Sequence, residues 1–376
     1  MLNKILVVFG TRPEAIKMAP VIYELQKSEL NVKVCVTAQH REMLDQVLIL
    51  FNITPDYDLN LMKPKQSLSE LTSNVILGIT EILDKENPDL VLVHGDTTTT
   101  MATSMAAYYE KVKVGHIEAG LRTNNIYSPF PEEINRQIVG RIATYHFAPT
   151  KSAASNIISE NISKENVFIV GNTVIDSLLF AVKKVKSKSF LRDFFKRLPF
   201  LLNRSSDRII LVTGHRRENF GNGFKNICQS LYDLATMHPN VQIVYPVHYN
   251  PNVALLVNEK LSNIENIHLI EPLDYLSFVK LMSLSYLIMT DSGGIQEEAP
   301  SLGKPVLLMR DTTERPEAVE AGTVLLVGTD KNNIVKVVND LLTDNKKYTN
   351  MVKAHNPYGD GNSSISIRKI MTELKI

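Results

Sequence analysis

A chain of 376 residues with 44% hydrophobic residues is long enough for two globular domains, and 41 basic against 40 acidic residues leave a formal charge of +1. This balance argues against a nucleic-acid surface and against a polybasic membrane anchor. The two cysteines, Cys35 and Cys228, form no metal or disulfide framework and are expected to be buried thiols. No apolar stretch reaches membrane-spanning length. We therefore expect a cytoplasmic protein.

Buried strands alternate with helices through the first half of the chain. The residue pattern predicts strands at 4–10, 32–37, 89–94, 112–117, 146–148 and 167–170, and helices at 14–25, 42–51, 67–85, 98–109 and from 132 onward. This alternation is typical of a doubly wound parallel sheet, which binds its ligands at the carboxyl ends of the strands.

Charged side chains gather at this predicted sheet edge. Arg12 follows the first strand, and Lys17 comes one turn into the next helix. A cation at a helix N-terminus opposes the helix dipole and so indicates an anionic partner, although a solvated arginine would give the same pattern. Asp96, Glu118 and Glu132 fall on the same edge. Asp96 could instead cap a helix and Glu132 could complement a helix dipole, but their coincidence favours a functional site.

A lysine- and arginine-rich stretch from 183 to 197 follows the first domain. Aromatic residues do not alternate with its charges, so we interpret it as a solvated helix and linker. The alternation of strands and helices then resumes, with strands predicted at 208–213, 241–246, 267–270, 287–289, 306–309 and 324–327, and a final helix at 364–374.

The densest polar stretch, LIMTDSGGIQEEAPSLGKPVLLMRDTTER, covers residues 287–315. Its strand, glycine-rich turn and helix would direct backbone N–H groups and the positive helix end at an anion. One of the two glutamates in the helix could accept hydrogen bonds from ribose hydroxyls. An ordinary turn capped by Asp291 or Ser292 is the alternative. Because no G-x-G-x-x-G follows a strand, we expect a nucleotide-sugar bound by its diphosphate, without a nicotinamide.

Eight sequence strings resemble one known family, the non-hydrolysing UDP-N-acetylglucosamine 2-epimerases. They are GTRPEAIKMAP, TAQHREMLDQV, HGDTTT, HIEAGLRT, PFPEEINR, TGHRREN, PVHYNP and TDSGGIQEEAPSLGKPVLLMRDTTERPEA, in this order over nearly the whole chain. The resemblance implies a GT-B fold, in which two doubly wound, Rossmann-like α/β domains face each other across a cleft, and a homodimer. We expect one domain at 1–171, to which a helix at 363–376 returns, and a second at 172–362.

The resemblance also implies the reaction, a reversible epimerisation at C2 between UDP-N-acetylglucosamine and UDP-N-acetylmannosamine that supplies bacterial surface polysaccharide. UDP is eliminated to give 2-acetamidoglucal and then re-added, without cofactor or metal. The matching catalytic residues are Asp96, Glu118, Glu132 and His215. The matching substrate contacts are Arg12, Lys17, Phe278, Ser292, Gly293, Gly294, Glu298 and Arg315. Which acid serves which face of C2 stays open.

Bacterial members of the family resemble one another in a regulatory site for a second UDP-N-acetylglucosamine. Gln39, Glu132, Arg216 and His248 match residues associated with it. Glu42 stands where some members have glutamine, and Lys65 where some have arginine. A carboxylate facing a diphosphate weakens binding, and lysine lacks the arginine fork, so we expect weak activation.

Three alternatives remain at this point. A GT-B glycosyltransferase would share the fold and the phosphate-binding turn, but it would leave three carboxylates unexplained. A hydrolysing epimerase would release free N-acetylmannosamine and accumulate UDP. A nucleotide-sugar sensor would bind without turnover.

Overall fold

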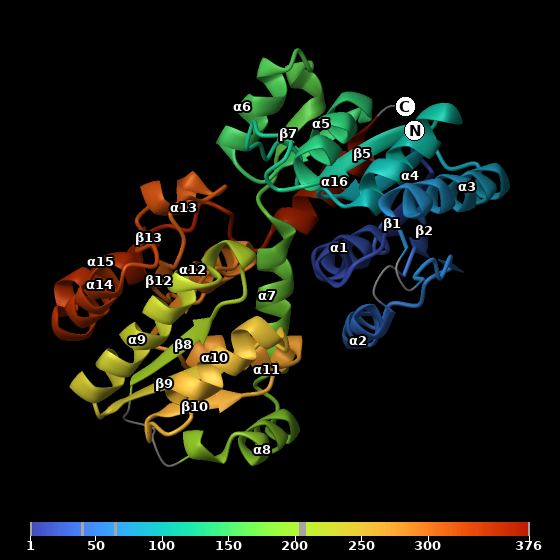
Figure 1. Cartoon of the computed structure of the whole chain (residues 1–376). Helices are drawn as coiled ribbons and strands as arrows, with labels where there is room; N and C mark the ends of the chain where they lie inside the picture. The colour runs from blue at the N-terminus through green and yellow to red at the C-terminus, as the bar shows by residue number, and fades with distance from the viewer. Residues whose placement is uncertain (1, 39–40, 64–65, 203–207, 375–376) are drawn as a thin grey trace. The chain divides into compact units, whose positions relative to one another are not determined.

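The computed structural model describes residues 2–38, 41–63, 66–202 and 208–374. The chain divides into two compact units (Figure 1). Unit 1 comprises Met1–Ser177 and Tyr358–Ile376, and unit 2 comprises Leu178–Pro357. Among the described residues, no helix is long and apolar enough to cross a membrane.

Unit 1 is built on a parallel sheet with the strand order β3-β2-β1-β4-β5-β6-β7. The strands are β1 (Lys4–Phe9), β2 (Asn31–Val36), β3 (Tyr57–Asp58), β4 (Leu90–His94), β5 (Lys113–Ile117), β6 (Tyr145–Ala148) and β7 (Val167–Ile169). The helices are α1 (Arg12–Leu25), α2 (Arg41–Phe51), α3 (Leu68–Glu86), α4 (Thr98–Tyr109), α5 (Glu132–Ile142), α6 (Lys151–Ser159), the start of α7 (Thr173–Lys184) and α16 (Ser363–Glu373).

Both faces of this sheet are covered, which explains the continuous apolar run of β1. On one face, Val8 and Val91 pack with α3 and α4 through Ile79 and Ala102. On the opposite face, α16 covers β5: a Cβ built on Gly115 would lie 3.5 Å from the Met371 methyl carbon. Full burial of one such aliphatic side chain stabilises the fold by about 1.5–3 kcal/mol.

Unit 2 contains a second parallel sheet with the order β10-β9-β8-β11-β12-β13. Its strands are β8 (Arg208–Thr213), β9 (Val241–Pro246), β10 (Ile267–Ile270), β11 (Leu287–Thr290), β12 (Val306–Leu308) and β13 (Val324–Leu326). Its helices, besides the rest of α7, are α8 (Lys188–Arg197), α9 (Asn222–Met237), α10 (Pro251–Leu261), α11 (Tyr275–Leu284), α12 (Gly293–Ser301), α13 (Pro316–Glu320), α14 (Lys331–Thr343) and α15 (Asn345–Lys353). The core of unit 2 includes Phe224 of α9, Val253 of α10 and Ile334 of α14.

The α/β class with two doubly wound sheets, predicted from the sequence, is confirmed. The sequence prediction lacks β3, α6, α7, α9, α10, α13 and α15. One boundary matters for function: α12 begins at Gly293 and not at Ile295, so both glycines of the turn lie in the first turn of the helix.

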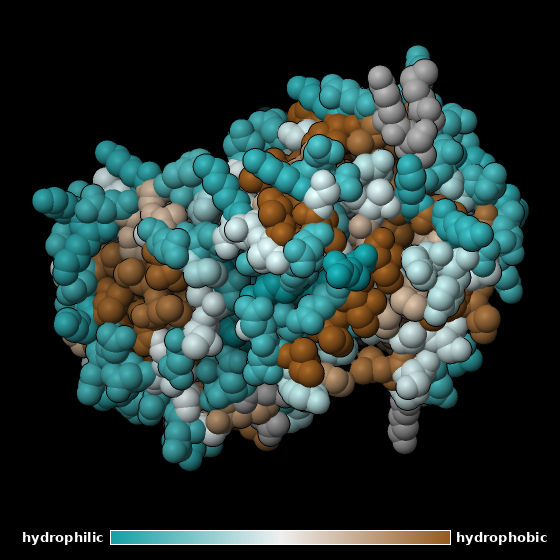
Figure 2. Space-filling view, turned by 90° about the horizontal axis from the view of Figure 1, so that it is seen from above, coloured by the Kyte–Doolittle hydropathy of each residue, from teal (hydrophilic) through white to brown (hydrophobic). Residues whose placement is uncertain are grey.

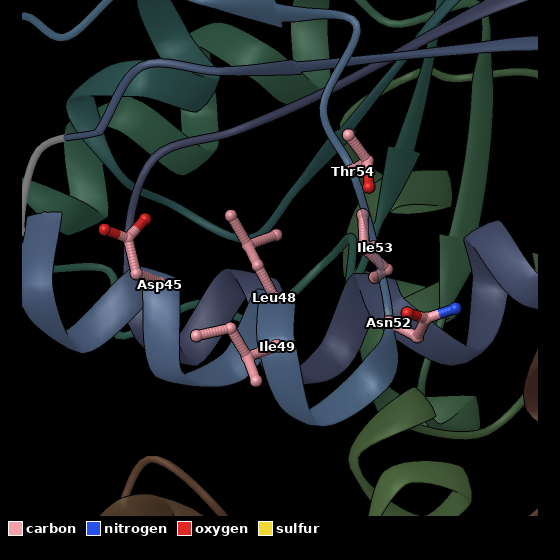
Figure 3. Close-up of a pocket in the computed structure, with 6 residues that line it drawn as sticks. All are labelled: Asp45, Leu48, Ile49, Asn52, Ile53 and Thr54. Atoms are coloured by element: carbon pink, nitrogen blue, oxygen red, sulfur yellow. The ribbon is translucent and has the colours of Figure 1, made fainter.

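A surface depression lies along α2 and is lined by none of the predicted site residues. Its lining side chains come from α2 and from the turn that follows it (Figure 3): Asp45, Leu48, Ile49, Asn52, Ile53 and Thr54. Ile49 is 80% exposed. None of these side chains is a predicted catalytic or substrate residue; most of those residues lie instead along the edges of the two sheets.

Candidate functional site

The strand order of unit 1 reverses between β1 and β4. The predicted acids lie in segments that follow β4 and β5. Asp96 follows β4, Glu118 follows β5, and Glu132 is the first residue of α5. Open α/β sheets bind ligands at such a reversal, beyond the carboxyl ends of the strands. The fold therefore places these three residues where a ligand is expected.

Glu14 joins the loop after β1 to the loop after β4. Its buried carboxylate accepts hydrogen bonds from the N–H groups of Gly10 (3.1 Å) and Thr11 (2.7 Å) and from the Thr97 hydroxyl (2.7 Å). Burial raises the pKa of Glu14, and these hydrogen bonds act in the opposite direction.

Thr97 caps α4, whereas the Asp96 carboxylate does not. The alternative that Asp96 is only a helix cap is wrong.

The Asp96 carboxylate instead pairs with Arg136 of α5. Its Oδ2 lies 2.7 Å from Nη2 and 3.0 Å from Nε of that side chain. Burial raises the pKa of Asp96; Arg136 partly offsets this effect, and the nearby Glu118 adds to it. Asp96 and Glu118 are thus within electrostatic reach, and a raised pKa suits a carboxyl group that must both hold and release a proton.

Two adjacent glutamates at the start of α5 have different surroundings. Oε2 of Glu132 is buried and has no hydrogen-bond partner among the described residues. Buried polar atoms without partners are rare and are typical of functional sites. Glu133 is fully buried and accepts from the N–H groups of Thr123 (3.0 Å) and Asn124 (3.1 Å) and from Arg136 (2.9 Å). Burial by itself would raise the pKa of Glu133, but these hydrogen bonds lower it, so its role is structural.

Glu118 is held at the carboxyl end of β5 in an unusual backbone conformation, with φ of +61°. Its Oε2 accepts hydrogen bonds from the Lys17 ammonium and from Nδ2 of Asn172 (2.8 Å). His94 Nε2 lies 3.8 Å from the same oxygen. The family resemblance assigns Lys17 as a substrate contact. In the structure, Lys17 is an ion-pair partner of Glu118. Asn172 and His94 are not predicted as site residues from the sequence.

His94 is a neutral neighbour of this acid. Its side chain is buried, and burial lowers its pKa to about 4. Neither of its ring nitrogens has a hydrogen-bond partner in the described part of the chain. Its position directly before Gly95 and Asp96, at the end of a buried strand, is the only sequence signal for it.

Arg12 is the first residue of α1, next to the capping box formed by Thr11 and Glu14. Considering only residues that the structure describes, Arg12 has no hydrogen bond or ion pair with another side chain. None of the described residues therefore supplies the anionic partner expected from the helix dipole, and a bound anion is the expected partner.

In unit 2 the strand order reverses between β8 and β11. Asp291, directly after β11, connects this strand to the loop that follows β8. This fully buried carboxylate accepts from the N–H groups of His215 (2.8 Å) and Arg216 (2.8 Å), and His215 Nδ1 lies 3.6 Å away. Burial lowers the pKa of His215; Asp291 opposes this effect, and His248 and Arg216 add to it. Asp291 positions the loop that carries His215. This role is absent from the sequence prediction.

The start of α12 is not closed by a side chain. Ser292 is the N-cap residue but makes no capping hydrogen bond, so neither proposed cap is present. A Cβ on Gly293 would lie 2.6 Å from Arg315 Nη1, whereas a Cβ on Gly294 would meet no atom within 4 Å. A helix N-terminus whose N–H groups receive no side-chain cap suits a phosphate.

Carboxylates around α12 hold two arginines in place. The fully buried Glu297 accepts from Arg315 Nε (2.6 Å), and Glu314 accepts from Arg315 Nη1 (2.6 Å) and Arg310 Nη1 (2.8 Å). Burial alone would raise the pKa of Glu314, but the two arginines lower it to about 2. Glu298 accepts from the Tyr275 hydroxyl (3.1 Å) of α11. Of the two neighbouring glutamates of α12, Glu297 thus binds Arg315, and Glu298 binds Tyr275.

The remaining predicted residues are less fully placed. Phe278 is half-buried on α11, the helix whose Tyr275 reaches Glu298. The His248 ring stacks on His215 with a centroid distance of 5.1 Å, so one predicted regulatory residue lies beside one predicted catalytic residue. Gln39 and Lys65 lie outside the described residues; Glu42 is the second residue of α2, and its side chain is not described.

Comparison with known proteins gives concordant results. Residues 23–372 match the family model described as UDP-N-acetylglucosamine 2-epimerase. The UDP-N-acetylglucosamine 2-epimerases of Salmonella typhimurium and Escherichia coli K12 are each 57% identical to this chain, over 99% of both sequences. The crystal structure of the Neisseria meningitidis enzyme bound to UDP-GlcNAc superposes with a TM-score of 0.92 at 54% identity, covering 99% of this chain and 100% of that one. The Methanocaldococcus jannaschii enzyme in complex with UDP-GlcNAc and UDP gives a TM-score of 0.83 at 35% identity, covering 98% and 99%.

Proposed function

The chain belongs to the UDP-N-acetylglucosamine 2-epimerase family of non-hydrolysing isomerases, and we propose that it epimerises C2 by eliminating and re-adding UDP. Its two Rossmann-like units have the GT-B-like fold of the family's solved structures. The proton on C2 of a hexosamine is not next to a carbonyl, so its direct abstraction is unfavourable. Elimination to 2-acetamidoglucal avoids that carbanion but requires acid/base groups on both faces of C2 and stabilisation of the departing diphosphate.

The observation that carries this proposal is the pairing of Asp96 and Glu118 at one sheet edge in contrasting surroundings. Burial raises the pKa of Asp96 beside Arg136. Glu118 receives hydrogen bonds from the Lys17 ammonium and the Asn172 amide, which favour the ionised carboxylate. Two carboxyl groups in different environments suit one proton donor and one proton acceptor. Glu132, with its buried oxygen, is the third acid/base candidate.

Unit 2 supplies most of the groups proposed to bind UDP, and Arg12 of unit 1 is added to them. The α12 N-terminus, with Ser292, Gly293 and Gly294, would accept the diphosphate. His215, anchored by Asp291, would stabilise the leaving phosphate. The groups proposed for the rest of the nucleotide and for additional charge are Glu298 at the ribose, Phe278 at the uridine, and Arg315 and Arg12.

Incubation of the purified protein with UDP-N-acetylglucosamine alone tests the proposed reaction. We expect a mixture of UDP-N-acetylglucosamine and UDP-N-acetylmannosamine at equilibrium, with no accumulating free sugar. Intact substrate would indicate a transferase lacking its acceptor, or a sensor. Free N-acetylmannosamine together with UDP would indicate a hydrolysing enzyme.

We also propose a weakened regulatory site that involves Gln39, Glu42, Lys65, Arg216 and His248. Like charges about 4 Å apart repel by roughly 4 kcal/mol at an effective dielectric constant near 20, before side-chain movement reduces this value. A carboxylate at Glu42 would therefore lower the affinity for a second nucleotide-sugar, and Lys65 would provide only a point charge in return.

Conversion of UDP-N-acetylmannosamine is accordingly expected to proceed without a strict requirement for added UDP-N-acetylglucosamine. The double variant Glu42→Gln, Lys65→Arg should be stimulated more strongly than the unmodified protein, which progress curves with and without effector would measure. A long lag that trace effector abolishes in the unmodified protein would contradict this expectation.

A homodimer and a cytoplasmic location complete the proposal. Hydrophobic residues are exposed among hydrophilic ones on one face of the molecule (Figure 2). In unit 1, Leu77 of α3 and Tyr108 and Tyr109 of α4 are 63%, 62% and 58% exposed, which gives apolar surface for a second copy. A sedimentation mass near that of a single chain would exclude the dimer.

The two cysteines are free and buried, in keeping with a reducing compartment, and cell fractionation would test the location.

A further inference from the structure

Asn172 connects the Glu118 carboxylate to the segment by which the chain leaves unit 1. The residue is 2% exposed and directly precedes α7. Its Nδ2 donates to Glu118 Oε2 at 2.8 Å. Its Oδ1 accepts from the N–H of Val174, in the first turn of α7, at 3.0 Å.

These two hydrogen bonds fix the orientation of the Asn172 amide. Only its amino group can donate to a carboxylate, and only its carbonyl oxygen can accept from a backbone N–H, so a flipped amide would lose both interactions. The backbone is held as well, since Asn172 N–H donates to the Tyr358 carbonyl at 2.8 Å. A Cβ on Gly171 would lie 2.6 Å from Ser363 Oγ, which shows how closely this segment packs.

The position of Glu118 depends on such support. Its φ of +61° is a conformation that non-glycine residues rarely adopt, so surrounding contacts must maintain it. Lys17 supplies charge from a long, flexible side chain, whereas Asn172 supplies a directional hydrogen bond without adding a charge. Proton transfer requires that the reacting carboxylate be held within about 0.5 Å of its productive position.

We propose that Asn172 is a positioning residue for proton transfer at C2: together with Lys17, its amide holds the Glu118 carboxylate in the correct orientation. This inference rests on the proposed function, because Glu118 must act on the sugar for its orientation to matter.

Asn172→Ser separates this role from the capping of α7. The serine hydroxyl can still accept from a first-turn N–H but is too short to reach Glu118. We expect kcat to fall about tenfold to a hundredfold, as for misplaced catalytic groups, with KM and the unfolding temperature little changed. Asn156→Ser is the matched control, because it removes an amide that donates to a backbone carbonyl (Gly120, 2.9 Å) in the same unit. It should retain kcat.

Asn172→Asp provides an independent test. The aspartate preserves the acceptor for Val174 N–H but places a second carboxylate against Glu118. Like charges disfavour ionisation, so the acidic limb of the kcat/KM profile should move to higher pH. An unshifted limb, with kcat unchanged, would overturn the proposal.

The deciding measurement repeats Asn172→Ser in a Glu118→Gln background. If Asn172 acts through Glu118, the second substitution causes no further loss of the residual turnover. An equal fold loss in both backgrounds would overturn this inference and leave the proposed function standing. Full turnover by Glu118→Gln alone would overturn only the acid/base role proposed for Glu118, whereas no epimerisation by the unmodified protein would overturn the proposed function itself.

Discussion

Replacing Glu118 with glutamine is expected to lower turnover by about 10²-fold or more, the usual scale for a general acid/base group. An amide cannot take up or release a proton under these conditions, and the substitution also removes the charge that pairs with Lys17. The affinity for UDP should be unchanged, because Glu118 is not among the groups proposed to bind UDP. Initial rates and UDP titration calorimetry would measure the two effects separately.

Asp96→Asn and Glu132→Gln should show comparable losses of turnover. Asp96→Asn has a second consequence, because it removes the charge of one of the two carboxylates that pair with the buried Arg136 in the described part of the chain, and the unfolding temperature should fall as well. Glu160→Gln is a suitable control, since that carboxylate pairs with Arg122 outside the acid cluster. Normal epimerisation by Glu118→Gln and by both of these variants would show that the three acids are structural.

Gly294→Ala is expected to weaken UDP binding at least about tenfold without lowering stability. A Cβ at this position meets no protein atom within 4 Å, so the folded protein accommodates it, and alanine favours helix over glycine. The added methyl group is expected to crowd a diphosphate bound at the α12 N-terminus, because such a ligand must approach the backbone closely. UDP titration and thermal unfolding would separate the two effects.

Gly223→Ala is the matched control for that substitution. Gly223 occupies the second position of α9, as Gly294 does in α12, and its Cβ would make ordinary contacts of 3.4 Å or more with Thr329. It should change neither UDP affinity nor turnover. Equal UDP affinities for Gly294→Ala and the unmodified protein would place the diphosphate elsewhere.

The fold class was predictable because a sheet covered on both faces requires continuously apolar strands. The runs at β1 and β11 satisfy this requirement and are fully buried over most of their length. Very short elements were not predictable. β3 has two residues and α13 five, so neither contains enough residues to show a period.

Site residues were predictable from the sequence only where a chemically suitable side chain directly follows a buried strand of the sheet. Asp96 and Glu118 each follow a buried strand, and adjacent parallel strands bring them to one edge. Their partners depend on tertiary packing: Lys17 is 101 residues from Glu118, and Asn172 is 54 residues away. Asp291 resembles a helix cap in the sequence, and only its burial and its hydrogen bonds to the loop after β8 reveal that it anchors His215.

Proton NMR of the protein with UDP-N-acetylglucosamine in deuterated water tests the elimination mechanism most directly. Protonation of 2-acetamidoglucal by carboxyl groups that exchange with solvent should replace the C2 proton with deuterium as epimerisation proceeds. The C2 proton signal should therefore disappear from UDP-N-acetylmannosamine as it forms, and from the substrate pool as equilibrium is reached. Complete retention of the C2 proton in the product would contradict elimination and re-addition of UDP.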